Sequence, residues 1–482
     1  IRILVATDNH IGYAESDPIR GQDSINTFRE ILQMAIDHDV DMLLLAGDLF
    51  HHNRPSRASL YSTIASLREF CLNQRPIRIE LVGDAGIGIP HGFNFPAVNY
   101  EDENLNVGLP VFSIHGNHDD PQGIGPEGAL CALDVLSASG LVNYFGRQEL
   151  PGNAQTDEEA LEEGLHIQPI LLQKGNTRLA MYGIGNIRDE RFHYEMRSNR
   201  IRMSRPAEYR DEWFNLMLVH QNRVAHGPKN SVPENGFGRE IDLVIWGHEH
   251  DCLIEPYEIP EKGYYISQPG SSIATSLARG EALTKKVGIL EIQGRDFAIN
   301  AVPLKSVRPF VFHDIILSDE EEENNLKLDT KTKVIKYLTK LVEVLISQAN
   351  AEWDERHVDD DPQPPRMLPL IRLRVEYTRP DGQGAYEVGN PQRFGQDFLG
   401  KIANPKDVVQ FYRKRKTRKP KNEIDYPENE IVPTQTKSEY IQVSTFVRQY
   451  LEAQNLGVLA ENGMQKAVST FVEKDDKDAI KA

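Results

Sequence analysis

Short apolar runs that stop abruptly at Gly, Asp, His or Asn recur through residues 1–305 and constrain the fold more than any other feature of the sequence. The runs are continuous rather than alternating, which is typical of strands that are buried on both faces of a sheet. Between the first two runs, residues 25–36 place their apolar side chains on one face of a helix. Strands that alternate with helices, followed by strands that can form a second sheet, predict a layered α/β domain. The runs are 3–7, 42–46, 111–114, 179–184, 216–220, 243–246 and 264–267.

Three further regions follow this domain, which we place at 1–305. A strand pattern, a long amphipathic helix and a strand in which Arg alternates with apolar residues predict a small α/β domain over 306–412. Residues 413–438 are basic and Pro-rich, as extended linkers are. Residues 439–482 hold two short amphipathic segments with no core of their own, which predicts a C-terminal helix-loop-helix.

Overall composition excludes some classes of protein but does not identify a partner. The 482 residues include 54 Lys and Arg against 72 Asp and Glu, and the formal net charge of −18 argues against a generic polyanion binder. The charge is segregated, however, because 413–421 is almost wholly basic. The sequence lacks the run of about 18 apolar residues that a membrane-spanning helix needs. Three widely spaced cysteines exclude a disulfide framework and favour a reducing compartment. Because the chain opens on a strand-like run without Met, we expect it to be trimmed.

Polar side chains collect where five of the predicted strands end. Ligands of α/β sheets bind beyond the carboxyl ends of the strands, so we expect these side chains to meet at the same edge of a sheet. Each motif alone is commonly a turn or a surface loop, but burying all of them without a cation would leave costly unsatisfied polar groups. The five sets are Asp8 and His10; Asp48; Asn117, His118 and Asp119; His220; and His248 and His250.

The types of side chain in this set narrow the choice of metal. Oxygen and nitrogen donors without a thiolate suit Mn, Fe or Zn rather than a closed structural zinc site. Hydrolytic sites of this kind hold two ions about 3.5–4 Å apart. Asp8 and Asp48 are the only certain anionic ligands, so two divalent ions would leave a strongly positive centre that attracts phosphate.

In order and spacing, these motifs match the pattern of the calcineurin-like metallophosphoesterases. The motifs are Asp8-x-His10, Gly47-Asp48, Gly116-Asn117-His118-Asp119 and Gly247-His248-x-His250. Protein phosphatases of that superfamily carry Asp-Arg-Gly after the Gly-Asp motif, whereas this chain reads Gly47-Asp48-Leu49-Phe50-His51. Essentially the whole chain closely resembles the nuclease subunits of the eukaryotic double-strand-break repair complex, the meiotic recombination nucleases. The resemblance implies an αββα metallophosphoesterase sandwich, a smaller α/β capping domain and the helix-loop-helix.

The resemblance also implies a dinuclear manganese centre with 3′–5′ exonuclease activity on duplex DNA and endonuclease activity on single strands. His118 would contact the scissile phosphate or the leaving group and would be oriented by Asp119, while His51 would help to place the phosphodiester. Asp48 would bridge the two Mn²⁺ ions. One ion would be held by Asp8, His10, Asp48 and His250, and the other by Asp48, Asn117, His220 and His248.

Accessory regions of the family imply binding partners and a location. The family forms homodimers, binds double- and single-stranded DNA, and acts in the nucleus, on chromatin and at telomeres. An SMC-like ABC ATPase would bind the terminal helices, and the Nijmegen breakage syndrome protein would bind the insertion loop 83–108. Candidate partner-binding residues are Phe93, Phe95, Tyr100, Val447, Leu451, Val468 and Phe471. Candidate DNA-binding residues are Arg413, Lys414, Arg415, Lys416, Arg418 and Lys419.

Two rival functions remain for this sequence. A phosphomonoesterase or protein phosphatase on the same fold is disfavoured by the missing Asp-Arg-Gly and by the appended basic run. A non-catalytic DNA-end-binding scaffold would need a broken ligand set, and the set here is intact.

Overall fold

The computed structural model describes residues 1–83, 95–122, 129–148, 164–198, 200–223, 231–380 and 384–413. The chain divides into two compact units, Ile1–Arg415 and Lys416–Ala482. Apart from Arg413, the expected linker and the expected terminal helices lie outside the described residues. Among the described residues, no helix is long and apolar enough to cross a membrane.

A mixed sheet contains the first group of buried strands. Its strand order is β15-β14-β1-β2-β4-β5, in which β1, β2, β4 and β5 run parallel and the hairpin of β14 and β15 joins antiparallel to β1. All residues of β2 and β4 are buried, as their continuous apolar runs predict. The strands are β1 Arg2–Ala6, β2 Met42–Ala46, β4 Val111–Ile114, β5 Asn143–Tyr144, β14 Lys286–Gln293 and β15 Asp296–Pro303.

A second mixed sheet contains the later strands in the order β12-β13-β11-β10-β8-β7-β3. Its centre, from β13 to β8, is parallel, and the strands at both edges are antiparallel to their neighbours. The strands are β3 Glu80–Leu81, β7 Ile170–Lys174, β8 Thr177–Ile184, β10 Trp213–His220, β11 Leu243–Gly247, β12 Leu253–Glu258 and β13 Tyr265–Gln268. A separate parallel pair joins β6 Leu165–Ile167 to β9 Ile201–Met203.

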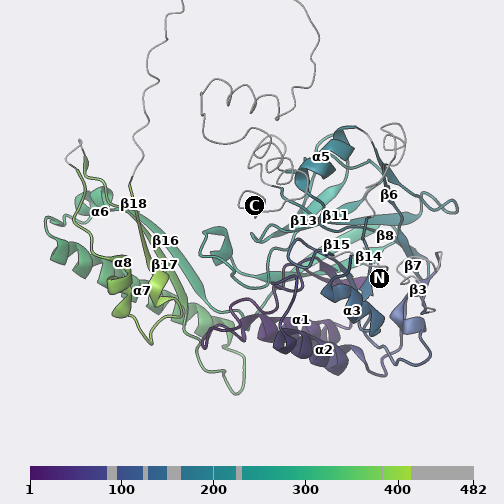
Figure 1. Cartoon of the computed structure of the whole chain (residues 1–482), viewed down its shortest axis with the longest axis horizontal. Helices are drawn as coiled ribbons and strands as arrows, with labels where there is room; N and C mark the ends of the chain where they lie inside the picture. The colour runs from purple at the N-terminus through teal and green to yellow at the C-terminus, as the bar shows by residue number, and fades with distance from the viewer. Residues whose placement is uncertain are drawn as a thin grey trace, which may run out of the picture. The chain divides into compact units, whose positions relative to one another are not determined.

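Helices and apolar clusters complete a four-layer sandwich, which confirms the predicted αββα fold. Alternate residues of a strand point to opposite faces of its sheet. Accordingly, Leu45 of β2 shares an apolar cluster with Leu32 of α1, whereas Leu44 shares another with Leu216 of β10. Phe192 of α5 lies in a third cluster, on the outer face of the second sheet. Figure 1 shows α1 and α2 side by side, away from α5. The helices are α1 Asp23–Asp37, α2 Arg57–Cys71, α3 Ala132–Ala138 and α5 Asp189–Arg197, with 3-10 turns η1 Asn99–Glu101 and η2 Gly280–Ala282.

The expectation that the five polar strand ends share an edge of one sheet is wrong. Strands β1, β2 and β4 belong to the first sheet, whereas β10 and β11 belong to the second. The polar ends still meet because the sheets are stacked face to face. The Nδ1 atom of His220, at the end of β10, lies 2.8 Å from the carbonyl oxygen of Ala46, at the end of β2.

A third, smaller sheet follows, which we call the capping sheet. Its strands β16, β17 and β18 are parallel, and α7 covers one face with Val334, Leu338, Val342 and Leu345. These four residues repeat at helical spacing, as the sequence predicts. The elements are β16 Phe310–Ile316, α6 Leu317–Glu323, α7 Lys331–Arg356, β17 Leu370–Glu376, α8 Pro391–Gln396, η4 Pro405–Asp407 and β18 Val409–Tyr412.

A buried ion pair joins the segment before the capping sheet to the sandwich. Arg308 donates from Nε and Nη2 to the two carboxylate oxygens of Asp23, each at 2.7 Å. Its remaining donors reach the carbonyl oxygens of Ile19 and Leu368 at 2.7 and 2.6 Å. Arg308 is only 7% exposed, so these hydrogen bonds satisfy a charge that could not otherwise be buried.

Candidate metal centre

The turns that follow the polar strands hold several side chains in an unusual backbone conformation. Asp8, His10 and Asp48 have φ angles of +51°, +47° and +51°, and His248 has +83°. Left-handed backbone costs about 1–3 kcal/mol for a residue other than glycine, and such strain clusters at functional sites. The strain lies at four of the seven residues that the sequence predicts as metal ligands.

Two glycines allow these turns to approach one another. Gly47 has a φ of +100°, and a Cβ atom there would lie 2.3 Å from Nδ1 of His220. A Cβ atom on Gly116 would lie 2.1 Å from Oδ1 of Asp48. Any side chain at either position would therefore displace a predicted ligand, which explains why both motifs carry glycine.

Asp8 presents one carboxylate oxygen to the centre. Its Oδ2 atom accepts hydrogen bonds from the Thr7 hydroxyl at 2.6 Å and from the backbone N–H of His248 at 3.1 Å. Its Oδ1 atom is buried and has no hydrogen-bond partner among the described residues. That atom lies 3.9, 4.0 and 3.6 Å from the Nε2 atoms of His10, His220 and His250. A buried carboxylate oxygen surrounded by imidazole nitrogens beyond hydrogen-bonding distance is the arrangement expected around a cation.

Asp48 lies between the histidines of the two sheets. Its Oδ2 atom is 3.4 Å from Nε2 of His220 and 3.8 Å from Nε2 of His10. Its Oδ1 atom accepts a hydrogen bond from the backbone N–H of His118 at 2.8 Å. Asp48 therefore faces a predicted ligand of each ion while it fixes the loop after β4.

A second group of predicted ligands surrounds Asn117. Its Oδ1 atom lies 2.7 Å from Nδ1 of His248 and 3.4 Å from Nε2 of His220. The other ring nitrogen of His248 lies 2.6 Å from Oδ1 of Asn222. All seven predicted metal ligands are thus brought together. Two triads, Asp8–His10–His250 and Asp8–Asp48–His220, have ligand atoms within 4.8 Å of one another, as does the triad His10–His51–His118.

The carboxylates of the centre favour positive charge at His220. Burial acts against a charged imidazole at His220, but the carboxylates of Asp48 and Asp8 outweigh it and raise the pKa of His220 to about 10. Burial also acts against the charged form of Asp48, yet His220 beside it keeps the pKa of that carboxyl well below its usual range. At His10 burial dominates and lowers the pKa well below the ordinary value. A metal cation could take the place of the His220 proton between these carboxylates.

The predicted catalytic residues His118 and His51 lie together at this centre. Their rings stack with centroids 4.9 Å apart and an interplanar angle of 21°. Nδ1 of His118 donates to the carbonyl oxygen of His51 at 2.6 Å, so Nε2 is the ring nitrogen that this hydrogen bond does not use. Burial, followed by the charge of His118, lowers the pKa of His51 to about 4.

The expectation that Asp119 orients the His118 ring is wrong. Asp119 is fully buried, and its carboxylate accepts from the backbone N–H groups of Gly116 at 2.6 Å and Leu49 at 2.7 Å. A carboxylate buried among backbone donors joins the turns after β2 and β4, and it is the His51 carbonyl that takes the proton of the His118 ring.

Two polar residues at the centre were not predicted. Glu281, in η2, accepts from Nδ1 of His250 at 2.9 Å. Asn222 holds the His248 ring and donates to Asp189. Asn222 could have been noticed because it lies two residues after His220, just beyond the end of a strand, whereas no local sequence pattern indicates Glu281.

The structure places only some of the predicted partner- and DNA-binding residues. Phe95 is 40% exposed, whereas the half-buried ring of Tyr100 packs against the core between the sheets. The Arg413 guanidinium lies 5.1 Å from the centre of the Tyr377 ring. Outside the described residues lie Phe93, Lys414, Arg415, Lys416, Arg418, Lys419, Val447, Leu451, Val468 and Phe471.

Comparisons with known proteins match both parts of the chain. The calcineurin-like phosphoesterase family model matches residues 1–252, and the Mre11 DNA-binding presumed domain matches residues 297–471. The chain is 54% identical to the double-strand break repair protein MRE11 of Coprinopsis cinerea over 491 residues, covering 100% of this chain and 66% of that protein. It is 47% identical to the double-strand break repair protein mus-23 of Neurospora crassa, covering 100% of this chain and 63% of that protein.

The chain thus spans 66% and 63% of the lengths of these two relatives. Among solved structures, a dimetal phosphatase from Danio rerio is 11% identical, with 63% of this chain and 96% of that chain covered. Its TM-score of 0.33 is too low to establish a shared fold by itself.

Proposed function

The chain belongs to the calcineurin-like phosphoesterase family, and we propose that it is the metal-dependent DNA nuclease of a double-strand-break repair complex. The observation that carries this proposal is the buried Oδ1 atom of Asp8, which lacks a hydrogen-bond partner in the described structure and faces three histidine rings. We propose 3′–5′ exonuclease activity on duplex DNA and endonuclease activity on single strands. Ends processed in this way would enter homologous recombination and meiotic repair.

The donor set suits two Mn²⁺ ions. Imidazole nitrogens with carboxylate and amide oxygens are ligands that Mn²⁺ accepts, and the set has no thiolate to select a softer metal. We assign one ion to Asp8, His10, Asp48 and His250, and the other to Asp48, Asn117, His220 and His248. When bound, such a pair of ions supplies a hydroxide at neutral pH and stabilises negative charge on the attacked phosphate.

His118 would act on the substrate rather than on the ions. Its Nδ1 atom donates to the His51 carbonyl oxygen, so Nε2 is the ring nitrogen that would meet the phosphodiester. In its protonated form the ring would donate to the leaving 3′ oxygen, a role worth about 10²–10⁴-fold in rate. The stacked His51 ring would help to place the phosphate, and Asp119 would hold the two turns at a constant separation.

The remaining regions would bring DNA and protein partners to this centre. We propose that 306–412 caps the nuclease domain at 1–305, and that the run from Arg413 to Lys419 contacts phosphates. The residues from Arg413 to Lys419 fall within the match to the Mre11 DNA-binding presumed domain. We also propose a homodimer that acts in the nucleus, on chromatin and at telomeres, and a docking role for the insertion loop 83–108 toward the Nijmegen breakage syndrome protein.

The segment 439–482 would bind an SMC-like ABC ATPase through its apolar faces. Phe471→Asp should abolish association with the ATPase coiled coil in a pull-down while DNA cleavage by the chain alone persists. Loss of folding with association intact would instead place this segment in the core of the chain.

Cleavage assays with the purified full chain test the proposed activity. Duplex and hairpin DNA should be cut with Mn²⁺, poorly with Mg²⁺, and not after chelation. A phosphodiester such as bis(p-nitrophenyl) phosphate should also be cleaved faster than the monoester p-nitrophenyl phosphate. Preference for the monoester would support the phosphatase alternative, and Mn²⁺ binding without any cleavage would support a DNA-end-binding scaffold.

A further inference from the structure

His250 is held from outside the proposed metal centre by a buried carboxylate. Nδ1 of His250 lies 2.9 Å from Oε1 of Glu281, which is only 4% exposed. On the opposite side of the ring, Nε2 of His250 lies 3.6 Å from Oδ1 of Asp8 and 3.0 Å from Nε2 of His10. A carboxylate that accepts the Nδ1 proton leaves the lone pair of Nε2 directed at the centre, which is the tautomer that a metal ligand needs.

Glu281 itself has little freedom to move. Its Oε2 atom accepts from Nζ of Lys285 at 2.8 Å and from the Ser271 hydroxyl at 3.1 Å. Its Oε1 atom also accepts from the backbone N–H groups of Thr275 and Ser276, each at 3.2 Å. The carboxylate is therefore fixed from several directions, mostly by residues of its own segment.

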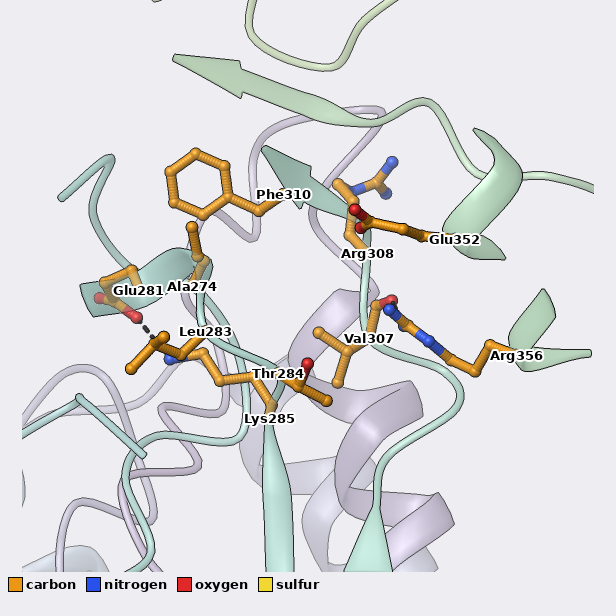
Figure 2. A pocket seen from close by; sticks show the side chains of 11 residues that line it. Ala274, Glu281, Leu283, Thr284, Lys285, Val307, Arg308, Phe310, Glu352 and Arg356 are labelled. Carbon is orange, nitrogen blue, oxygen red and sulfur yellow. Dashed lines mark hydrogen bonds and ion pairs between the residues drawn. The ribbon is translucent and has the colours of Figure 1, made fainter. Parts of the chain in front are cut away.

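The segment 274–285, which carries Glu281, also packs against the capping sheet. Ala274 shares an apolar cluster with Phe310 of β16, and Leu277 packs against that cluster. In Figure 2, Ala274 and Glu281 lie beside Phe310 on one side of a small pocket, and Glu352 and Arg356 of α7 lie on its other side. The pocket has a volume of about 40 Å³, and residues of the segment and of α7 line it.

We infer that Glu281 is a positioning residue for His250, and that packing of the segment 274–285 against the capping sheet helps to set the orientation of this metal ligand. The inference rests on the proposed metal centre and adds to it a structural link between the capping sheet and one ligand. Glu281 touches neither of the predicted ions and acts only through His250.

Metal affinity of the full chain provides the first test. Partners of a ligating histidine change metal affinity about 10–100-fold when they are removed. Glu281→Ala should therefore weaken binding of one Mn²⁺ ion by that factor in calorimetric titration, and Glu281→Gln, which keeps an acceptor oxygen, should restore part of the loss. Glu291→Gln, which alters a half-exposed carboxylate paired with Arg2, is the control and should bind Mn²⁺ as the unaltered chain does.

The tautomer of His250 in the metal-free chain provides a test that needs no metal. Ring ¹⁵N spectra, assigned with His250→Gln, should show the Nδ1–H form in the unaltered chain and in Glu281→Gln, and a mixture of tautomers in Glu281→Ala. An unaltered chain that binds no Mn²⁺ would overturn the proposed function but leave this measurement intact. Unchanged tautomer and unchanged Mn²⁺ affinity in a folded Glu281→Ala would overturn the inference alone.

The link to the capping sheet is tested with two leucines of the same segment. Leu277 packs against the cluster that contains Phe310, whereas Leu283 is 45% exposed. Leu277→Ala should weaken Mn²⁺ binding severalfold, as Glu281→Ala should. Leu283→Ala should leave Mn²⁺ binding unchanged. Equal Mn²⁺ affinity in the two leucine variants would show that the capping sheet does not influence His250.

Discussion

The carboxylate of Asp48 accepts a 2.8 Å hydrogen bond from the backbone N–H of His118, although the two residues are 70 positions apart. The same carboxylate faces His10 and His220 with its other oxygen. Asp48 thus contacts two other predicted metal ligands and also fixes the loop that carries His118. Changes at Asp48 combine both effects, whereas changes to the His118 side chain leave the backbone hydrogen bond in place and can isolate catalysis.

His118→Leu should retain Mn²⁺ occupancy and DNA binding while DNA cleavage falls by about 10²–10⁴-fold. The substitution removes the ring that we place against the leaving oxygen but preserves the backbone donor to Asp48. Single-turnover cleavage and metal analysis by mass spectrometry measure the two properties on one sample. His38→Leu, at an exposed histidine, is the matched control. If occupancy falls together with cleavage, His118 has a structural role.

Asp119→Ala should lower the free energy of unfolding of the metal-free chain by about 2–5 kcal/mol, because buried backbone donors of two turns would lose their acceptor. Urea unfolding measures the change. Asp37→Ala, at an exposed aspartate of α1, should change stability by less than about 0.5 kcal/mol. An Asp119→Ala chain of normal stability would show that these backbone hydrogen bonds contribute little to folding.

Arg308→Ala should destabilise the chain by about 3–5 kcal/mol, since it leaves the carboxylate of Asp23 buried without its partner. Arg366→Ala breaks an ion pair of similar geometry with Asp354, but both side chains are about half exposed, so the destabilisation should stay below about 1 kcal/mol. Calorimetric unfolding compares the two. Similar destabilisation in both variants would mean that the Arg308 pair contributes no more than a surface pair.

Neutralising several residues of 413–421 should weaken DNA binding at all sequences alike. For each phosphate that the protein no longer neutralises, the slope of log affinity against log salt should decrease in magnitude by about 0.9 on duplex DNA. Fluorescence anisotropy at several salt concentrations measures the slope, and cleavage of bis(p-nitrophenyl) phosphate should persist as the internal control. A slope that does not change would mean that the basic run serves localisation or solubility.

Continuous apolar runs allowed the central strands and a layered α/β domain to be predicted from sequence, whereas the αββα order of the layers was implied by the family resemblance. The run at 42–46 coincides with β2, and all five of its residues are buried. The expectation that all five polar strand ends share an edge of one sheet was wrong, since a run of this kind shows that a strand is buried but not which sheet it joins. The distribution of β10 and β2 between stacked sheets depends on long-range packing.

The predicted metal ligands could be found because each follows a strand directly within a short motif. The hydrogen-bond partner of the His118 ring could not be predicted, because it is the backbone carbonyl of His51 and every residue has such a group. Glu281 was missed for a similar reason: it lies 31 residues after His250 and reaches that ring only through the fold of 274–285. Tyr100 stays a predicted partner-binding residue, and the partly buried packing of its ring against the core could not be predicted from its place in a long loop.

The Mn²⁺ content of the purified chain tests the central claim most directly. Mass spectrometry under native conditions should find two Mn²⁺ ions in the unaltered chain, none in Asp48→Ala, and mainly one in His250→Ala. The expected difference arises because Asp48 faces ligands of both proposed ions, whereas His250 faces only the Asp8–His10 group. Two ions retained by Asp48→Ala would contradict the bridging assignment, and no ions in the unaltered chain would contradict the metal centre itself.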